Sequence, residues 1–478
     1  MSIKKNFFHN ILFILSNILF PIISFSYSSR ILGPEGLGKV QFIITFAQYF
    51  VLVAALGIPI YGIREVAKTR GDKNKLSKLF SELLIINIIS SSVLLAIYIV
   101  VVFSVGWFHN NITFYILGGV IVLTGFSIID WFFVGMEQFH FLSIRSIIIK
   151  GAAVVALFLF IKTPKDLLIY FLITIFSLIG NNLWNLTNLK GQVNIQFEHL
   201  ALRKHIPVLF TLFSTTVVVS IYTMVDTLFL GFLTDDRAVG FYTAAVKITK
   251  IAIPLVASLG TVLIPRITQS IVSKDDDLLQ KLSNQAFSFI CFFAIPISFG
   301  LFFYAQEIIV VFSGVKYLEA IPTMQIAAPL VVLIGLGSIF GPQLLIPSGN
   351  EKKFFLATIF GMVTSVVLNL CLIKIFRDKG AAIATVMAEV IVTGIAYYFV
   401  YKKMKLRFDW GLGLKAFLAC LVFIPIGCLV REYISYIPLR FGVAVVSCAG
   451  GYFLTQLFVF KESQMMGIYM SVFKKGLK

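Results

Sequence analysis

Charged residues are scarce in this sequence. They make up 13% of its 478 residues, whereas 59% are apolar; a soluble domain has about a quarter charged residues. Apolar runs of roughly 20 residues separate short charged clusters, and each run is long enough to cross a ~30 Å hydrocarbon core as a helix. The runs are continuously apolar and do not alternate, which favours helices over a barrel. The sequence therefore predicts an all-α integral membrane protein.

The sequence also lacks the usual signatures of an enzyme. Its five cysteines lie within apolar runs and show neither a disulfide framework nor metal-ligand spacing. It has no Walker loop, no His-Glu-x-x-His and no Gly-x-Ser-x-Gly motif. Segments between the predicted helices do not exceed about 20 residues, too short for a soluble catalytic domain. We therefore expect no enzymatic activity, no metal, no cofactor and no ATP-driven pump within this chain.

The apolar runs predict about fourteen transmembrane spans. Their approximate bounds are 7–29, 40–62, 81–105, 114–135, 146–162, 167–187, 206–232, 238–264, 285–309, 322–346, 354–376, 380–401, 413–430 and 439–459.

Lysine and arginine concentrate in alternate segments between these spans. The basic segments are 64–78, 190–204, 266–281, 352–353, 402–407 and the tail at 474–475. The positive-inside rule places them in the cytoplasm, together with both termini. The net charge of +18 is then a matter of topology and of attraction to anionic lipid headgroups, and does not indicate nucleic acid.

Two halves of the chain repeat each other at an offset of about 200 residues. Arg30 to Gly38, after the first predicted span, matches Gly231 to Gly240, after the seventh. Arg64 and Arg266 are likewise equivalent. Six spans separate the copies, so both have the same orientation, as in parallel-repeat transporters. We expect six-helix lobes at 1–190 and 191–408, and two additional helices and a cytoplasmic tail at 409–478.

The repeated motifs resemble those of a known family. Ser29-Arg-Ile-Leu-Gly-Pro-Glu-Gly-Leu-Gly38 and Val239-Gly-Phe-Tyr-Thr-Ala-Ala245 are similar to segments of Wzx-type polysaccharide flippases, as is Gly135 to Leu142. That family belongs to the multidrug/oligosaccharidyl-lipid/polysaccharide (MOP) exporter superfamily, with the MATE exporters and lipid II flippases. The resemblance implies two lobes around a central cavity and an undecaprenyl-diphosphate-linked oligosaccharide as substrate. It also implies a bacterial cytoplasmic membrane and, as further partners, other polysaccharide-assembly membrane proteins.

Polar residues form matching stripes in the two copies. Thr243, Lys247 and Lys250 share one face of a predicted helix, and the equivalent positions in the first copy are Gln41, Thr45 and Gln48. Because ionisable groups within the membrane normally face a cavity or a partner, we place both stripes at the interface between the lobes. The lysines would either bind the substrate's diphosphate or neutralise acids such as Asp226 and Glu389.

Other charged residues have two interpretations each. Arg30 would hold the substrate diphosphate, as the resemblance implies, or extend to the outer headgroups. Arg64 and Arg266 lie at the predicted inner mouth, where they attract the diphosphate or only fix the topology. Asp130 is expected to pair with Arg64 or Arg145. It is also, with Asp226 and Glu389, a candidate for coupling to H⁺ or Na⁺.

The sequence thus predicts a flippase that moves lipid-linked oligosaccharide from the inner to the outer leaflet by alternating access. The alternatives are a MATE-type exporter of drugs or small cations, a lipid II flippase of the same fold, and a membrane-embedded polymerase or glycosyltransferase. The short outer segments near 313–323 and 431–439 argue against such an enzyme.

Overall fold

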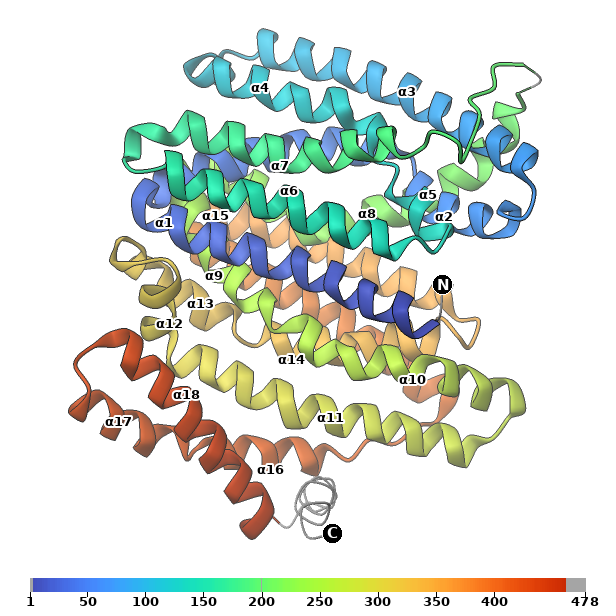
Figure 1. Cartoon of the computed structure of the whole chain (residues 1–478). Helices are drawn as coiled ribbons and strands as arrows, with labels where there is room; N and C mark the ends of the chain where they lie inside the picture. Colours follow the sequence, from blue (N-terminus) through green and yellow to red (C-terminus); the bar gives the residue numbers. More distant parts are fainter. Residues whose placement is uncertain (1–2, 199, 461–478) are drawn as a thin grey trace. The chain divides into compact units, whose positions relative to one another are not determined.

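The regular structure of this chain is helical in a computed structural model that describes residues 3–198 and 200–460. This confirms the predicted all-α membrane fold; the predicted cytoplasmic tail lies outside the described residues. Figure 1 shows the helices in chain order. The chain divides into two compact units, residues 1–240 and 241–478. Helix α8 belongs to the first unit and packs against α1 and α2, whereas the sequence assigned it to the second lobe; the predicted lobe bounds remain a prediction.

The helices of the first unit are α1 (Ile3–Ala55), α2 (Ile58–Thr69), α3 (Lys73–Ser104), α4 (Ile112–Leu123), α5 (Asp130–Gly135), α6 (Phe139–Phe160), α7 (Leu167–Thr187) and α8 (Ile206–Leu233). Helix α9 (Asp236–Ile251) crosses the boundary. Those of the second unit are α10 (Ile253–Ser273), α11 (Asp276–Phe303), α12 (Ala305–Phe312), α13 (Ile321–Ala327), α14 (Leu330–Ser338), α15 (Glu351–Met404), α16 (Trp410–Cys420), α17 (Phe423–Tyr433) and α18 (Ile437–Leu454).

The expected number of fourteen spans is not confirmed. In the described residues, eleven segments are long and apolar enough to cross a membrane. Two of them, α1 and α15, each cover two predicted spans. The eighth predicted span, 238–264, is divided between α9 and α10, because the helix is interrupted at Ala252, two residues before Pro254.

Helix α1 contains two spans separated by a single residue. At 53 residues it would measure about 80 Å if straight, far more than a bilayer. Gly33 leaves the helical conformation with φ 74°, a value that glycine adopts without a steric penalty, and Pro34 begins the second half. Figure 1 shows α1 turning back on itself. The glycine-rich motif at 30–38 is therefore helical on both sides of a turn that is confined to Gly33.

The first unit is packed around α1, which contacts α3, α4, α6 and α8. Aromatic rings from α1, α3, α4 and α8 interlock at one end of it, with Phe46 in ring contact with Tyr98, Tyr115 and Phe232. At the other end a buried apolar cluster joins α2, α3 and α5 to the start of α8.

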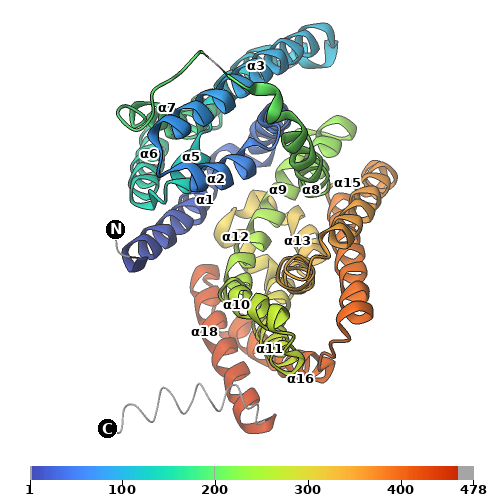
Figure 2. The ribbon, with the colours of Figure 1, turned by 90° about the vertical axis from the view of Figure 1, so that its right-hand side faces the viewer.

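The second unit is organised around α11, which contacts α10, α14 and α16. Helices α16, α17 and α18 form the last layer beside it, and Figure 2 labels two of them, α16 and α18. An ion pair joins this layer to α12. Arg431 of α17 donates to the buried carboxylate of Glu307 in α12, from Nε at 2.8 Å and from Nη2 at 3.1 Å.

Candidate functional site

The predicted stripe of the first unit lies on the second half of α1. Gln41 donates from Nε2 to Thr45 Oγ1 at 3.1 Å, and Thr45 is buried. Gln48 is half-buried. Its neighbour Tyr49 donates to the carbonyl of Ser220 in α8 at 3.4 Å. This stripe is therefore uncharged and lies beside α8.

Two charged candidates in the first unit differ in environment. Asp226, in α8, is 1% exposed and interacts electrostatically with Tyr49. It therefore lies near the end of the α1 stripe. Arg30 is exposed, three residues before the kink at Gly33.

The stripe of the second unit carries the positive charge. Along α9, Thr243 is buried, Lys247 is exposed and Lys250 is half-buried. Lys250 interacts electrostatically with Glu389 of α15, whose side chain is buried. Glu389 was one of the two acids proposed as a neutralising partner, and the structure places it beside Lys250.

The two arginines expected at the inner mouth are both exposed. Arg64 donates to Glu65 at 3.0 Å, and its guanidinium lies 5.4 Å from the centre of the Tyr61 ring. Arg266 lies on α10. Their proposed role in attracting the diphosphate remains a prediction.

Asp130 pairs with Arg145, not with Arg64. The two Nη atoms of Arg145 donate to the Asp130 carboxylate at 2.9 and 3.3 Å, and Asn185 donates to it at 2.6 Å. Arg145 also bonds Asn185 and is 2% exposed. The network joins α5, α6 and α7, so the carboxylate already has several partners, which favours a structural role.

A buried acidic group in α3 escaped the sequence analysis. Glu82 is 0% exposed and accepts three bonds: from the backbone of Ala201 at 2.8 Å, from His205 Nε2 at 2.8 Å and from Lys204 Nζ at 3.2 Å. The other ring nitrogen of His205 bonds the Tyr61 hydroxyl at 2.8 Å. If His205 is neutral, the charges of Glu82 and Lys204 cancel. Glu82, Lys204, His205 and Tyr61 then each have a hydrogen-bond partner within this group.

The same face of α3 holds the segment that connects α7 to α8. Ser77 and Ser81, one turn apart, accept from the backbone N–H groups of Asn194 at 3.0 Å and Gln196 at 2.8 Å. The connection is therefore attached to α3 by side chains at 77, 81 and 82, which we call the α3 latch. In the sequence, Glu82 sits at the edge of a predicted span, and nothing local pairs it with His205.

The two copies of the repeated glycine motif touch each other. A Cβ added at Gly38 would lie 1.7 Å from the carbonyl oxygen of Asp236 and 2.7 Å from the nitrogen of Gly240. A Cβ at Gly240 would lie 2.0 Å from the carbonyl oxygen of Pro34. Only glycine allows this approach of α1 to α9.

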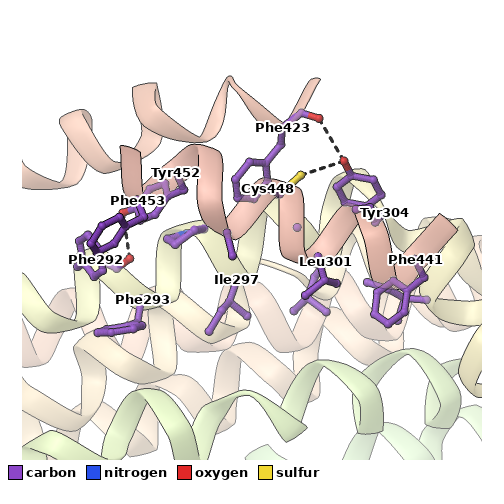
Figure 3. A pocket seen from close by; sticks show the side chains of 16 residues that line it. Phe292, Phe293, Ile297, Leu301, Tyr304, Phe423, Phe441, Cys448, Tyr452 and Phe453 are labelled. Atoms are coloured by element: carbon purple, nitrogen blue, oxygen red, sulfur yellow. Dashed lines mark hydrogen bonds between the residues drawn. The ribbon is translucent and has the colours of Figure 1, made fainter. Parts of the chain in front are cut away.

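An apolar groove of about 510 Å³ lies in the second unit between α11 and the α17–α18 hairpin (Figure 3). Sixteen residues line it, among them Phe293, Ile297 and Val445. Two tyrosine hydroxyls at the groove are already bonded: Tyr304 donates to the Phe423 carbonyl at 3.2 Å, and Tyr452 to the Phe292 carbonyl at 3.0 Å. The groove therefore presents an apolar surface, and it is built from helices that are candidate membrane spans.

Comparison with known proteins defines the class. The family model described as "Polysaccharide biosynthesis protein" matches residues 3–271, and the MatE model matches residues 212–371. The chain belongs to the polysaccharide biosynthesis protein family. It is a Wzx-type member of the MOP superfamily, which confirms the resemblance seen in its motifs.

Among curated proteins, the chain is 26% identical over 414 residues to the "Putative O-antigen transporter" of Escherichia coli (strain K12), covering 84% of this chain and 97% of that protein. It is 28% identical over 181 residues to the "Lipid II flippase MurJ" of Bacillus subtilis (strain 168), covering 37% of this chain and 32% of that protein.

Solved structures share the fold. The lipid II flippase MurJ in an inward closed conformation aligns with a TM-score of 0.68 at 16% identity, covering 95% of this chain and 97% of MurJ. An inward-facing MATE-family multidrug transporter aligns with a TM-score of 0.68 at 16% identity, covering 81% of this chain and 94% of that structure.

Proposed function

We propose that this protein is a flippase that moves undecaprenyl-diphosphate-linked oligosaccharide from the inner to the outer leaflet of a bacterial cytoplasmic membrane. It would work by alternating access, without a cofactor and without catalysing a reaction. Both termini would lie in the cytoplasm. Its product would pass to other membrane proteins of polysaccharide assembly.

The observation that carries this proposal is the apolar groove in a chain of the polysaccharide biosynthesis family. Such a substrate has a charged, strongly hydrated head and a long polyprenyl tail. The head cannot cross hydrocarbon without a prohibitive desolvation cost, but the tail can stay in an apolar environment throughout. A groove lined by Phe293, Ile297 and Val445 would hold part of the tail. Since lipid tails are equally apolar, its preference would come from packing, not from the hydrophobic effect.

The charged head requires a cationic partner. Lys247 is the exposed lysine of the second stripe, and an ammonium is a suitable point charge for phosphate. Lys250 would join it, and Arg30, Arg64 and Arg266 would attract the diphosphate at the two ends of its path.

The contact between Lys250 and Glu389 suggests how ion coupling would work. While Glu389 is ionised, it balances Lys250. A proton on Glu389 would leave Lys250 unbalanced and add positive charge to the stripe that would bind the diphosphate. Glu389 is thus our first candidate for proton coupling, with Asp226 the second, whereas Asp130 is held by Arg145 and Asn185.

Reconstitution in liposomes tests the proposal. The purified protein is incorporated with the lipid-linked sugar on one leaflet, and the glycan that reaches an external lectin is followed over time. We expect movement faster than in protein-free liposomes, and no movement of lipid II in a parallel sample. Equal rates for both lipids would indicate a general flippase, and no movement of either would refute the assignment.

The energy source is tested in the same liposomes. The proton, sodium and voltage gradients are collapsed one at a time. Coupling through Glu389 predicts that the proton gradient alone matters and that Glu389→Gln abolishes its effect. Equal rates in all conditions would reject ion coupling and leave facilitated flipping.

A second candidate function is a MATE-type drug or cation exporter, which the fold permits. The lysines of the second stripe disfavour a cationic cargo. Rapid export of a cationic dye by the reconstituted protein would support this alternative.

A further inference from the structure

The first and last turns of α15 lie side by side and carry an unusual group of lysines. The helix folds back at Arg377, where φ is 54°, so that residues 351–353 and 402–404 end up together. Lys353 Nζ lies 5.9 Å from the centre of the Phe399 ring and donates to Asn350 at 2.7 Å. One contact across the fold of the helix, to Phe399, and one local hydrogen bond, to Asn350, therefore fix the position of Lys353.

Three ammonium groups meet there. Lys403 is within side-chain hydrogen-bonding reach of Lys353, and Lys402 interacts with Lys353 electrostatically. Lys402 also lies 5.6 Å from the centre of the Tyr398 ring and donates to its hydroxyl at 3.2 Å. We call Lys353, Lys402 and Lys403 the lysine cluster. Among the described residues, no carboxylate forms an ion pair with any of them.

This arrangement calls for an anion. Like charges at hydrogen-bonding distance repel each other, and an anion placed between them would turn that repulsion into attraction. A phosphate group is suitable, because it offers several oxygens to several ammonium donors.

The surroundings indicate which phosphate. Tyr398 and Tyr401 beside the lysines are 52% and 56% exposed. Leu356 and Phe360, one turn apart on the first half of α15, are 42% and 50% exposed. A charged head site that continues into an exposed apolar helix face matches a phospholipid, whereas a soluble phosphate would use only the lysines.

We propose that the lysine cluster binds the headgroup of an anionic phospholipid whose acyl chains lie along α15. The positive-inside rule places this end of α15 in the cytoplasmic leaflet. The bound lipid is a resident partner of the second unit and not the cargo, so the proposal stands independently of the transported substrate.

Native mass spectrometry of the purified full chain tests this. The protein is titrated with phosphatidylglycerol and, separately, with phosphatidylcholine. We expect at least roughly tenfold tighter binding of phosphatidylglycerol, since each lysine near an anionic headgroup contributes about 1 kcal/mol. The triple variant K353Q/K402Q/K403Q should lose this preference. The control K190Q/K274Q/K281Q removes the same charge at exposed lysines elsewhere and should keep it.

Three results would overturn the proposal: no preference in the wild type, an equal loss in the control, or full competition by inorganic pyrophosphate, which would indicate a site for soluble phosphates. Thermal melting of both variants checks that they are folded. If the triple variant does not purify, K403Q alone replaces it, with an expected weakening of about fivefold.

Discussion

Replacing Gly38 by alanine should separate the two copies of the repeated motif. The new Cβ would lie 1.7 Å from the carbonyl oxygen of Asp236, about half of an ordinary carbon–oxygen contact distance. The obstacle is backbone and not the end of a flexible side chain, so no rotamer change relieves it. The backbones of α1 and α9 would have to move apart by roughly 1.5 Å or more.

The loss of stability caused by Gly38→Ala can be compared with that of a matched control in the same motif. Overpacking a tight contact costs about 1–3 kcal/mol, and more where the neighbours cannot yield; we expect Gly38→Ala at or above the upper end. A Cβ at Gly36 would instead meet the Cδ1 atom of Leu167 at 3.2 Å, and that side chain can shift. Gly36→Ala should cost less than about 1 kcal/mol.

The assay is thermal unfolding of the purified protein in detergent, in which the loss of monodisperse protein is measured as the temperature rises. Gly38→Ala should melt well below both wild type and Gly36→Ala, and Gly240→Ala should match it because its Cβ would meet the carbonyl oxygen of Pro34 at 2.0 Å. Equal melting temperatures for Gly36→Ala and Gly38→Ala would refute the close backbone approach.

Three further outcomes are expected. Lys247→Ala combined with Lys250→Ala should leave the protein inserted in the membrane but reduce export of surface polysaccharide; normal export at normal expression would remove both residues from the mechanism. Glu82→Gln should weaken the α3 latch by about 1–3 kcal/mol, because a buried charged acceptor is lost, and limited proteolysis should then cut the α7–α8 connection faster; unchanged cutting would argue against the latch. Ala449→Trp should fill the apolar groove and slow flipping, whereas Val446→Trp, at a side chain 74% exposed and outside the groove, should have little effect.

The fold class followed from composition because apolar length is a local property. A run of about 20 apolar residues specifies a membrane helix wherever it occurs in the chain. The exact number of spans was harder to predict, since it depends on where helices are interrupted. Gly33 lies in the gap left between the predicted spans 7–29 and 40–62, but the division of the eighth span at Ala252 was not expected. The apolar sequence of the eighth span continues on both sides of Ala252. Only the interruption of the helix at this residue separates α9 from α10.

Candidate site residues could be named from the sequence where a repeat or a charge within the membrane gave a signal, and their role in transport remains a prediction. The stripe of Thr243, Lys247 and Lys250 was found from its helical spacing, and Glu389 was among the acids named as partners. Arg145 was named as a partner of Asp130 only together with Arg64, since sequence separation gives no means of choosing between them.

The α3 latch was missed for a physical reason. Glu82 and His205 are far apart in the sequence, and each alone has an ordinary role at the end of a span. Their pairing arises only because α3 and the start of α8 share one apolar cluster, which brings a carboxylate and an imidazole together where both are buried. Burial then makes the pairing obligatory, because an unpaired charge there would cost several kcal/mol. The roles of Glu82 and His205 depend on a tertiary contact between distant segments. A sequence pattern within one segment could therefore not have predicted them.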